Sequence, residues 1–193
     1  MTRIKVMLVE DDEFWVENIC RELNNEKDIE IVKVASTKDD AVHYARENAI
    51  DTILMDINLS SNNMDGIEAV KEINSFTHTN IIMLTNIVDT DVILHCFEHG
   101  AINYISKSNI RDMVEAIRDS VTEGSGIHPD AAEALRKGYQ KLKKLQILTS
   151  VEREVYELKE SGFTVKQIAS RLHKSFYTVK NQLSVIRNKL NPY

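Results

Sequence analysis

The sequence is poor in the residues that break or cross-link a chain. Among 193 residues it has two prolines, six glycines and two cysteines, while 42% of the residues are hydrophobic. This balance favours a folded chain over a disordered one. Cys20 and Cys96 lie far apart within helical patterns, which excludes a disulfide framework and a zinc site and favours buried, reduced thiols in a cytoplasmic protein.

The sequence also lacks the signals of membrane insertion and export. No apolar run approaches the ~20 residues of a membrane span. The segment Met1–Asp11 is a short apolar strand that runs into acidic residues, which is not the layout of a signal peptide. We therefore expect no segment inserted in a membrane and no signal peptide.

Charge is not spread evenly along the chain. Residues 1–128 hold 11 Lys and Arg against 24 Asp and Glu, a net charge of −13, whereas residues 129–193 hold 13 against 6, a net charge of +7. A single compact fold gives no reason for this sorting, so we expect two units with different partners. The basic unit suits nucleic acid or an acidic membrane surface, and the acidic unit by itself suits neither.

Short apolar runs alternate with helix-period segments over the first 122 residues. Five strands, each followed by a helix, predict a parallel α/β sheet that is covered on both faces. In such sheets, functional residues lie just beyond the C-terminal ends of the strands. The expected strands are 4–9, 29–35, 52–55, 80–84 and 101–105, and the expected helices are 13–24, 38–48, 66–76, 89–98 and 110–121.

The composition changes after residue 122. Residues 123–129 (EGSGIHP) predict a break, residues 130–146 predict a Lys-rich helix, and the rest predicts three short helices without a strand. Capping-box patterns at 149–152 and 164–167 mark two of the helix starts. The expected domains are residues 1–124, a linker with a helix at 125–147, and a small all-α domain at 148–193.

Residues with distinctive chemistry follow the predicted strands. Clustered carboxylates repel one another unless a cation offsets them, and Mg²⁺ with oxygen ligands fits best. Asp56 then suits a nucleophile toward a phosphoryl group, and the ammonium of Lys107 and the hydroxyl of Thr85 suit the remaining phosphoryl oxygens. The residues in question are Glu10, Asp11 and Asp12 after the first strand, Asp56 after the third, Thr85 after the fourth and Lys107 after the fifth.

Residues 3–122 resemble the receiver domains of two-component response regulators. The resemblance rests on VEDD at 9–12, LMD at 54–56, MDG at 64–66, LT at 84–85, GA at 100–101 and YISK at 104–107. It implies a flavodoxin-like (βα)5 fold with strand order 2-1-3-4-5, and phosphorylation of Asp56 by a histidine kinase. It also implies that Asp11 contacts Mg²⁺ directly, that Glu10 acts through water, and that Asp56 and the main-chain carbonyl of Asn58 complete the ligands.

The resemblance further implies a switch made by Thr85 and Tyr104. Thr85 is expected to move toward the phosphoryl group, and Tyr104 to turn inward into the vacated space. Taken one at a time, each residue has a plainer interpretation: a turn former for Asp56, a solvated lysine for Lys107, a loop hydroxyl for Thr85 and a half-buried strand aromatic for Tyr104. For Asp12, a simple helix cap is as well supported as a role in the site.

Three departures from the receiver pattern bear on the lifetime of the phosphorylated state. The stretch 56–66 is about two residues longer than usual and lacks the common proline. Asn86 follows Thr85 where a small residue is more usual, and Asn58 is polar two residues beyond the acceptor. Both asparagines are expected to border the path of the attacking water.

The C-terminal segment predicts a helix with two distinct faces. An apolar stripe lies opposite a basic, amide-rich face, which is what a helix in the DNA major groove requires. A short helix precedes it, joined through residues 173–175, so the pair reads as a helix-turn-helix. The stripe is Val179, Leu183, Ile186 and Leu190, and the polar face is Lys180, Asn181, Ser184, Arg187 and Asn188.

This half resembles the LuxR-type helix-turn-helix, so the whole chain resembles a NarL/FixJ-family response regulator. The matching segments are LTSVEREV at 148–155, G-x-T at 162–164, KQIA at 166–169 and TVKNQLSVIRNKL at 178–190. The resemblance implies a further helix after the recognition helix, and the sequence printed here stops at Tyr193 before such a helix. We therefore expect dimerisation through the receiver or through the linker leucines 135, 142 and 145, or else weak DNA binding by this half alone. We expect Lys180, Asn181 and Ser184 at base edges, Lys166, Thr178 and Arg187 at phosphates, Tyr177 near the DNA backbone and Phe176 in the core.

The sequence therefore predicts a transcription regulator whose phosphorylation at Asp56 favours a homodimer on DNA. We expect it to catalyse only its own Mg²⁺-dependent phosphotransfer and dephosphorylation, with a sensor histidine kinase and DNA as partners and no membrane partner. A second hypothesis is a phosphorylation-regulated module whose C-terminal domain binds a protein partner. A third, an enzyme acting on small phosphorylated metabolites, is disfavoured because Asn58 stands where such an enzyme needs a second aspartate, and because it leaves the basic tail unexplained.

Overall fold

The structure is a computed structural model that describes residues 3–60, 64–86, 89–122 and 126–190. It divides into two compact units, Met1–Arg136 and Lys137–Tyr193, and each unit is described by itself. Three predicted features fall partly outside the described residues: the long stretch after Asp56 at 61–63, the predicted break at 123–125, and the end of the chain at 191–193.

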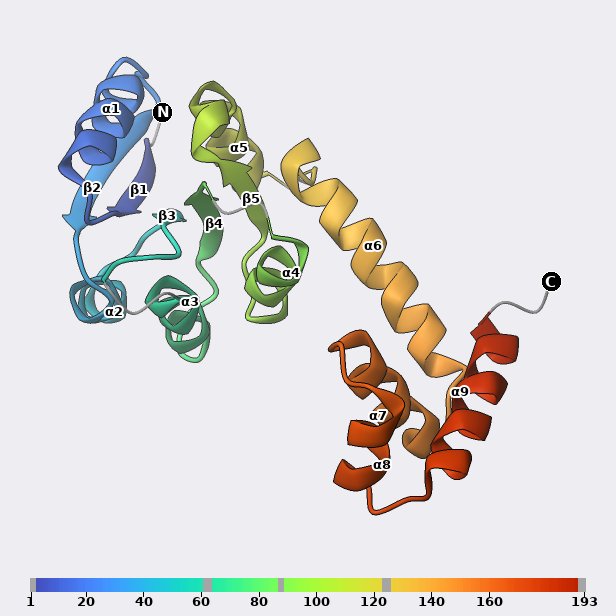
Figure 1. The fold of residues 1–193 in the computed structure, drawn as a ribbon. Helices are drawn as coiled ribbons and strands as arrows, with labels where there is room; N and C mark the ends of the chain where they lie inside the picture. Colours follow the sequence, from blue (N-terminus) through green and yellow to red (C-terminus); the bar gives the residue numbers. More distant parts are fainter. Residues whose placement is uncertain (1–2, 61–63, 87–88, 123–125, 191–193) are drawn as a thin grey trace. The chain divides into compact units, whose positions relative to one another are not determined.

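Five parallel strands form the centre of the first unit, in the order β2-β1-β3-β4-β5 (Figure 1). This confirms the predicted flavodoxin-like topology. All four residues of the central strand β3 are buried, as expected for a strand covered on both faces. The strands are β1 (Ile4–Val9), β2 (Ile29–Ala35), β3 (Thr52–Met55), β4 (Asn80–Thr85) and β5 (Asn103–Ser106).

Helices cover both faces of this sheet (Figure 1). Helices α1 (Glu13–Asn24) and α5 (Met113–Ser120) pack on one face, around Ile19 and Ile117. Asp12 caps α1, since its side chain accepts a hydrogen bond from the Phe14 amide at 2.9 Å, so the helix-cap interpretation of Asp12 is confirmed. The opposite face is covered by α2 (Lys38–Glu47), α3 (Asp65–Asn74) and α4 (Thr90–Glu98).

The predicted helix at 110–121 is wrong in its first turn. The chain leaves β5 into a 3₁₀ helix, η1 (Lys107–Asp112), and only then enters α5. Asn109 interrupts the helical geometry with φ −109° and ψ 35°, and the Ser106 side chain accepts a hydrogen bond from the Ser108 amide at 3.3 Å. Lys107 is therefore held in a tight turn immediately after the strand, where it is buried.

The linker helix α6 (Pro129–Gln146) contributes residues to both units. In the first unit, Ala131 and Ala134 are buried in the core cluster that also contains Ile93 of α4 and Tyr104 of β5, and Leu135 packs against that core. In the second unit, Leu145 packs against the C-terminal core. Of the three leucines expected to form a dimer interface, only Leu142 is largely exposed, at 61%.

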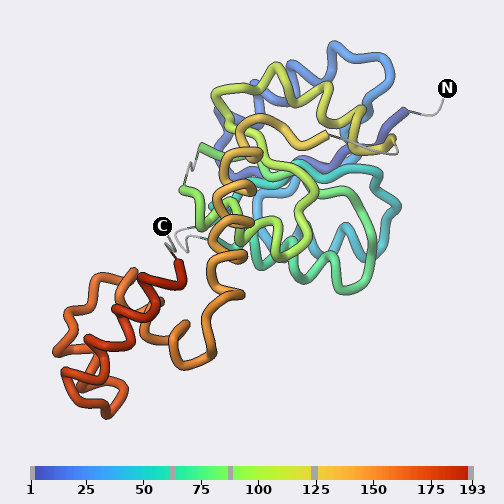
Figure 2. Tube along the Cα trace, turned by 90° about the vertical axis from the view of Figure 1, so that its right-hand side faces the viewer, coloured from blue at the N-terminus to red at the C-terminus, as the bar shows by residue number. Residues whose placement is uncertain are grey.

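Three further helices complete the second unit and lie against one another in both views (Figures 1 and 2). They are α7 (Ser150–Glu160), α8 (Val165–Arg171) and α9 (Phe176–Leu190). Both predicted capping boxes are present, Thr149 with Glu152 and Thr164 with Gln167. Among the helices of the described ranges, none combines the length and the apolar character that crossing a membrane requires.

Candidate functional site

An acidic cluster lies at the C-terminal edge of the sheet. Glu10 and Asp11 follow β1 and Asp56 follows β3, and one carboxylate oxygen of each lies within 4.8 Å of the others. Glu10 and Asp56 are buried, at 1% and 7% exposure, while Asp11 is exposed. Parallel strands bring these residues together although about 45 positions separate them in sequence.

Lys107 is the buried cation of this cluster. Its Nζ lies 2.5 Å from Glu10 Oε2 and 3.0 Å from Asp56 Oδ2. The other oxygen of Asp56, Oδ1, accepts a hydrogen bond from the Ile57 amide at 2.7 Å. Both oxygens of Asp56 are thus held, which fixes the direction in which its carboxylate faces.

Burial shapes the electrostatics of the cluster. Desolvation raises the pKa of Glu10 above its usual value, the hydrogen bond from Lys107 acts in the opposite direction, and the nearby charge of Asp56 raises the pKa further. Three carboxylates against one ammonium leave an excess of negative charge. Clustered carboxylate oxygens with this excess fit a hard divalent cation such as Mg²⁺.

Hydrogen bonds with Asp65 and Gly66, of the MDG motif at 64–66, hold the segment after Asp56. The Gly66 amide donates to the Ile57 carbonyl at 2.9 Å. The carboxylate of Asp65 accepts from the Leu59 amide at 2.9 Å and from the Ser60 hydroxyl at 2.5 Å. The side-chain Oδ1 of Asn58, on the same segment, is buried and has no hydrogen-bond partner among the residues that the structure describes.

Thr85 and Tyr104 lie on the neighbouring strands β4 and β5. Both are buried, at 2% and 1% exposure. The Tyr104 ring belongs to the core cluster beneath α4, and its hydroxyl has no hydrogen-bond partner within the described part of the chain. Burial raises the pKa of this hydroxyl well above its usual value. Tyr104 is therefore in the inward position in this structure.

Trp15 is a neighbour of the site that the sequence analysis missed. Its ring centroid lies 5.3 Å from Lys107 Nζ, within the range of a cation–π contact. The sequence position of Trp15 was the signal that could have identified it. Trp15 lies in the first turn of α1, and α1 begins directly after the acidic residues that follow β1.

The second unit presents the predicted DNA-contacting face to solvent. The apolar stripe of α9 faces the core, with Val179 and Ile186 buried and Leu183 and Leu190 partly buried. A turn with His173 at φ 51° joins α8 to α9. The seven predicted contact residues are all exposed: Lys166, Tyr177, Thr178, Lys180, Asn181, Ser184 and Arg187.

The expectation that Phe176 packs in the core is wrong. Its side chain is 41% exposed, and its ring contacts Tyr177 edge to face at 5.8 Å between centroids. The first turn of α9 extends beyond the apolar stripe, which begins at Val179, so nothing in the core cluster covers Phe176.

Family models match both units. Residues 6–118 match the response regulator receiver domain, and residues 146–192 match the bacterial regulatory proteins of the luxR family. The receiver match alone covers more than half of the chain.

Individual proteins match over nearly the whole chain. The response regulator protein VraR of Staphylococcus epidermidis is 32% identical over 190 residues, covering 97% of this chain and 90% of that protein. The transcriptional regulatory protein DegU of Brevibacillus brevis is 29% identical, over 98% and 88%. RcsB of Salmonella enterica serovar Typhimurium, solved bound to promoter DNA, has the same fold, with a TM-score of 0.71, 19% identity and coverage of 98% and 92%.

Fold, motifs and relatives agree over both units. The chain therefore belongs to the NarL/FixJ-type response regulators of two-component systems, which join a receiver domain to a LuxR-family DNA-binding domain.

Proposed function

We propose that this response regulator accepts a phosphoryl group on Asp56 from a histidine kinase. The observation that carries the proposal is the contact of a buried aspartate with a buried lysine inside an acidic cluster. An oxygen of Asp56 forms a bond to phosphorus, the bond from phosphorus to the donor's imidazole nitrogen breaks, and that nitrogen keeps the electron pair. Lys107 then pairs with an oxygen of the transferred group.

The proposed cofactor is Mg²⁺. Its ligands are Asp11, Asp56 and the Asn58 carbonyl, with Glu10 acting through water; the clustered carboxylate oxygens support this assignment. When bound, the ion neutralises negative charge on the phosphoryl oxygens. Lys107 offsets part of the same charge, and its contacts with Glu10 and Asp56 hold its ammonium at the place where phosphoryl oxygens arrive.

Return to the resting state requires hydrolysis of the acyl phosphate. Water attacks phosphorus, the bond from phosphorus to the Asp56 oxygen breaks, and inorganic phosphate leaves the restored carboxylate. Asn58 and Asn86 are proposed to border the path of this water. The orphaned, buried Oδ1 of Asn58 supports the assignment, because it is an acceptor with no protein partner among the described residues.

The phosphoryl group is proposed to work through Thr85 and Tyr104. It adds a charge of roughly −1.5 to −2 and several strong acceptor oxygens. A hydrogen bond from the Thr85 hydroxyl to one of these oxygens shifts the end of β4. Tyr104, which is already inward in this structure, is then held in that position. The surface of α4, β5 and α5 changes as a result, which favours dimerisation.

The proposed output is sequence-specific DNA binding that regulates transcription, in the cytoplasm. Lys180, Asn181 and Ser184 are assigned to base edges. Lys166, Thr178, Arg187 and Tyr177 are assigned to the DNA backbone. The exposure of all seven side chains and the promoter-bound structure of RcsB support this output.

Labelling by a phosphodonor tests the acceptor. With a radiolabelled small-molecule acyl phosphate and Mg²⁺, the wild-type chain incorporates label and Asp56→Asn does not. Asp39→Asn serves as a control, because Asp39 is an exposed aspartate in the first turn of α2. Unchanged labelling of Asp56→Asn contradicts the assignment.

Selection of bound fragments from genomic DNA at fixed salt tests the output. The phosphorylated chain is expected to bind selected fragments at least tenfold more tightly than the unphosphorylated chain. Equal affinity in both states contradicts the proposal and favours a protein partner for the C-terminal domain.

A further inference from the structure

We propose that Asp130, in the first turn of the linker helix α6, is a positioning residue for the phosphorylation site. It acts through the turn that carries Lys107, so the linker helps to set the chemistry of the receiver. The proposal rests on the proposed role of Lys107.

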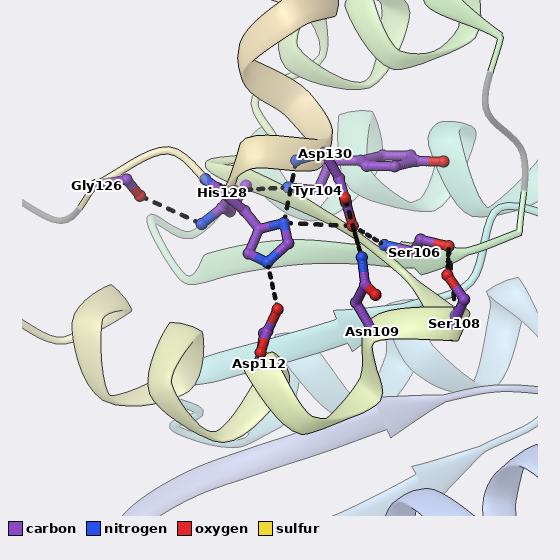
Figure 3. Close-up of polar contacts among 9 residues, drawn as sticks. Tyr104, Ser106, Ser108, Asn109, Asp112, Gly126, His128 and Asp130 are labelled. Atoms are coloured by element: carbon purple, nitrogen blue, oxygen red, sulfur yellow. Dashed lines mark hydrogen bonds and ion pairs between the residues drawn. The ribbon is translucent and has the colours of Figure 1, made fainter.

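Asp130 contacts Ser106 and Asn109, which precede and follow Lys107 in the sequence (Figure 3). Its Oδ2 accepts a hydrogen bond from the Ser106 amide, directly before Lys107, at 2.9 Å. Its two oxygens accept from the side-chain amide of Asn109, two residues after Lys107, at 3.0 Å each. Asn109 is the residue at which η1 departs from helical geometry. Hydrogen bonds to the Asp130 carboxylate of α6 therefore hold the irregular turn in which Lys107 is buried.

Asp130 is itself fixed by neighbours of the same unit. Its amide donates to His128 Nδ1 at 3.2 Å, and the same ring nitrogen lies 3.3 Å from Asp130 Oδ2. His128 Nε2 lies 3.1 Å from an oxygen of Asp112 (Figure 3). The His128 amide donates to Asn103 Oδ1 at 3.0 Å, and Asn103 lies on β5 beside Tyr104. A chain of hydrogen bonds therefore joins the start of α6 to both ends of β5.

Apolar packing fastens the same turns of α6. Ala131 and Ala134 are buried, at 0% and 4% exposure, in the core cluster that contains Tyr104. The backbone of Asp130 cannot move away from the Lys107 turn unless these side chains leave the core. The receiver family model ends at residue 118, twelve positions before Asp130. In this chain the receiver thus includes a structural element that the family boundary omits.

This arrangement makes the coupling reciprocal. If Asp130 stabilises one position of Lys107, then a change in the position of Lys107 must change the stability of the contact between α6 and the receiver by the same free energy. The stability of the contact between α6 and the receiver therefore depends on the state of the phosphorylation site, in addition to any change at Thr85 and Tyr104.

Phosphorylation kinetics of the full chain test the proposal. Asp130→Ala is expected to slow the incorporation of phosphate from an acyl phosphate by about tenfold, because small misplacements of catalytic groups cost one to two orders of magnitude. Asp130→Asn keeps an acceptor for the Ser106 amide and is expected to restore most of the rate. Arg136→Ala, an exposed position on the same helix, is expected to match the wild type.

Repeating the measurement in a Lys107→Ala variant distinguishes a positioning role of Asp130 from a general effect of Asp130 on stability. When Lys107 is already replaced by alanine, adding Asp130→Ala is expected to change the phosphorylation rate less than twofold. The loss of thermal stability caused by Asp130→Ala is expected to be similar with Lys107 present and with Lys107→Ala. A wild-type rate for Asp130→Ala, or an equal slowing with and without Lys107, overturns the proposal. Labelling of Asp56→Asn, or an unchanged rate in Lys107→Ala, instead overturns the proposed function on which it rests.

Discussion

Gly66 packs directly against the main chain of Asp56. A β-carbon at residue 66 would collide with the Asp56 carbonyl oxygen and would lie 2.9 Å from both the carbonyl carbon of Asp56 and the α-carbon of Ile57. These are backbone atoms, so they cannot rotate out of the way. The close approach of the start of α3 to the end of β3 therefore fixes the backbone from which the Asp56 side chain projects.

Gly66→Ala is expected to lower the free energy of unfolding by about 2 kcal/mol or more, because overpacking a rigid site costs ~1–3 kcal/mol. The variant is also expected to lose most phosphorylation, since the Asp56 backbone must shift. Chemical denaturation and phosphodonor labelling measure the two effects. Gly126→Ala is the control, because a β-carbon there meets nothing within 4 Å. Equal stability of the two variants contradicts the explanation.

Tyr104→Phe is expected to preserve stability or raise it by about 1 kcal/mol. The Tyr104 hydroxyl is buried without a hydrogen-bond partner among the described residues, and an unsatisfied buried polar group costs ~1–3 kcal/mol. Tyr104→Ala is expected to cost ~3–5 kcal/mol because it removes the ring from the core. Thermal and urea denaturation measure both. A loss above about 1 kcal/mol in Tyr104→Phe would show that the hydroxyl has a partner in solution.

Substitutions on the basic face separate phosphate contacts from base contacts. Lys166→Ala is expected to weaken binding about equally for all DNA sequences and to lower the slope of log affinity against log salt by about 1. Asn181→Ala is expected to cost ~1–3 kcal/mol on the preferred site only. Titrations at three salt concentrations measure both effects. Lys159→Ala, an exposed lysine near the end of α7, is the control. A sequence-specific loss in Lys166→Ala would reverse the two assignments.

An ion pair beside β2 gives a pH prediction. Arg118 donates to both oxygens of Asp28 at 2.8 Å, and these hydrogen bonds lower the pKa of Asp28 from 3.8 to about 2. A carboxyl with a lowered pKa stabilises the fold above its unfolded pKa, and the contribution is lost as pH falls toward the folded value. The Tm difference between wild type and Asp28→Asn should be constant from pH 7 to about 5 and shrink below 4.

The sheet and the acidic cluster were predictable because both follow from one rule. Repeated βα units require parallel strands, and parallel strands place all their C-terminal ends at one edge. Glu10, Asp56 and Lys107 therefore had to lie near one another, although nothing in the spacing gave their distances. The capping boxes of α7 and α8 were predictable for a local reason, since each depends on residues only three positions apart.

The remaining features depend on contacts that local patterns do not encode. The turn at Lys107 is 3₁₀ rather than α-helical because the carboxylate of Asp130 accepts hydrogen bonds from the Ser106 amide and the Asn109 side chain. Asp130 lies 21 residues beyond Asn109, so no local pattern shows this contact. Phe176 is exposed because the core ends at Val179, which apolar spacing alone does not show. Both errors arise where tertiary contacts decide between two locally acceptable states.

The position of Trp15 has a practical consequence. It is the only tryptophan in the sequence, and its indole lies 5.3 Å from the Lys107 ammonium. The emission of an indole depends on nearby charge, so the tryptophan fluorescence of the unlabelled chain reports on one place only. Binding of a cation, arrival of a phosphoryl group and displacement of Lys107 can each be followed in real time, with no dye attached and no residue replaced.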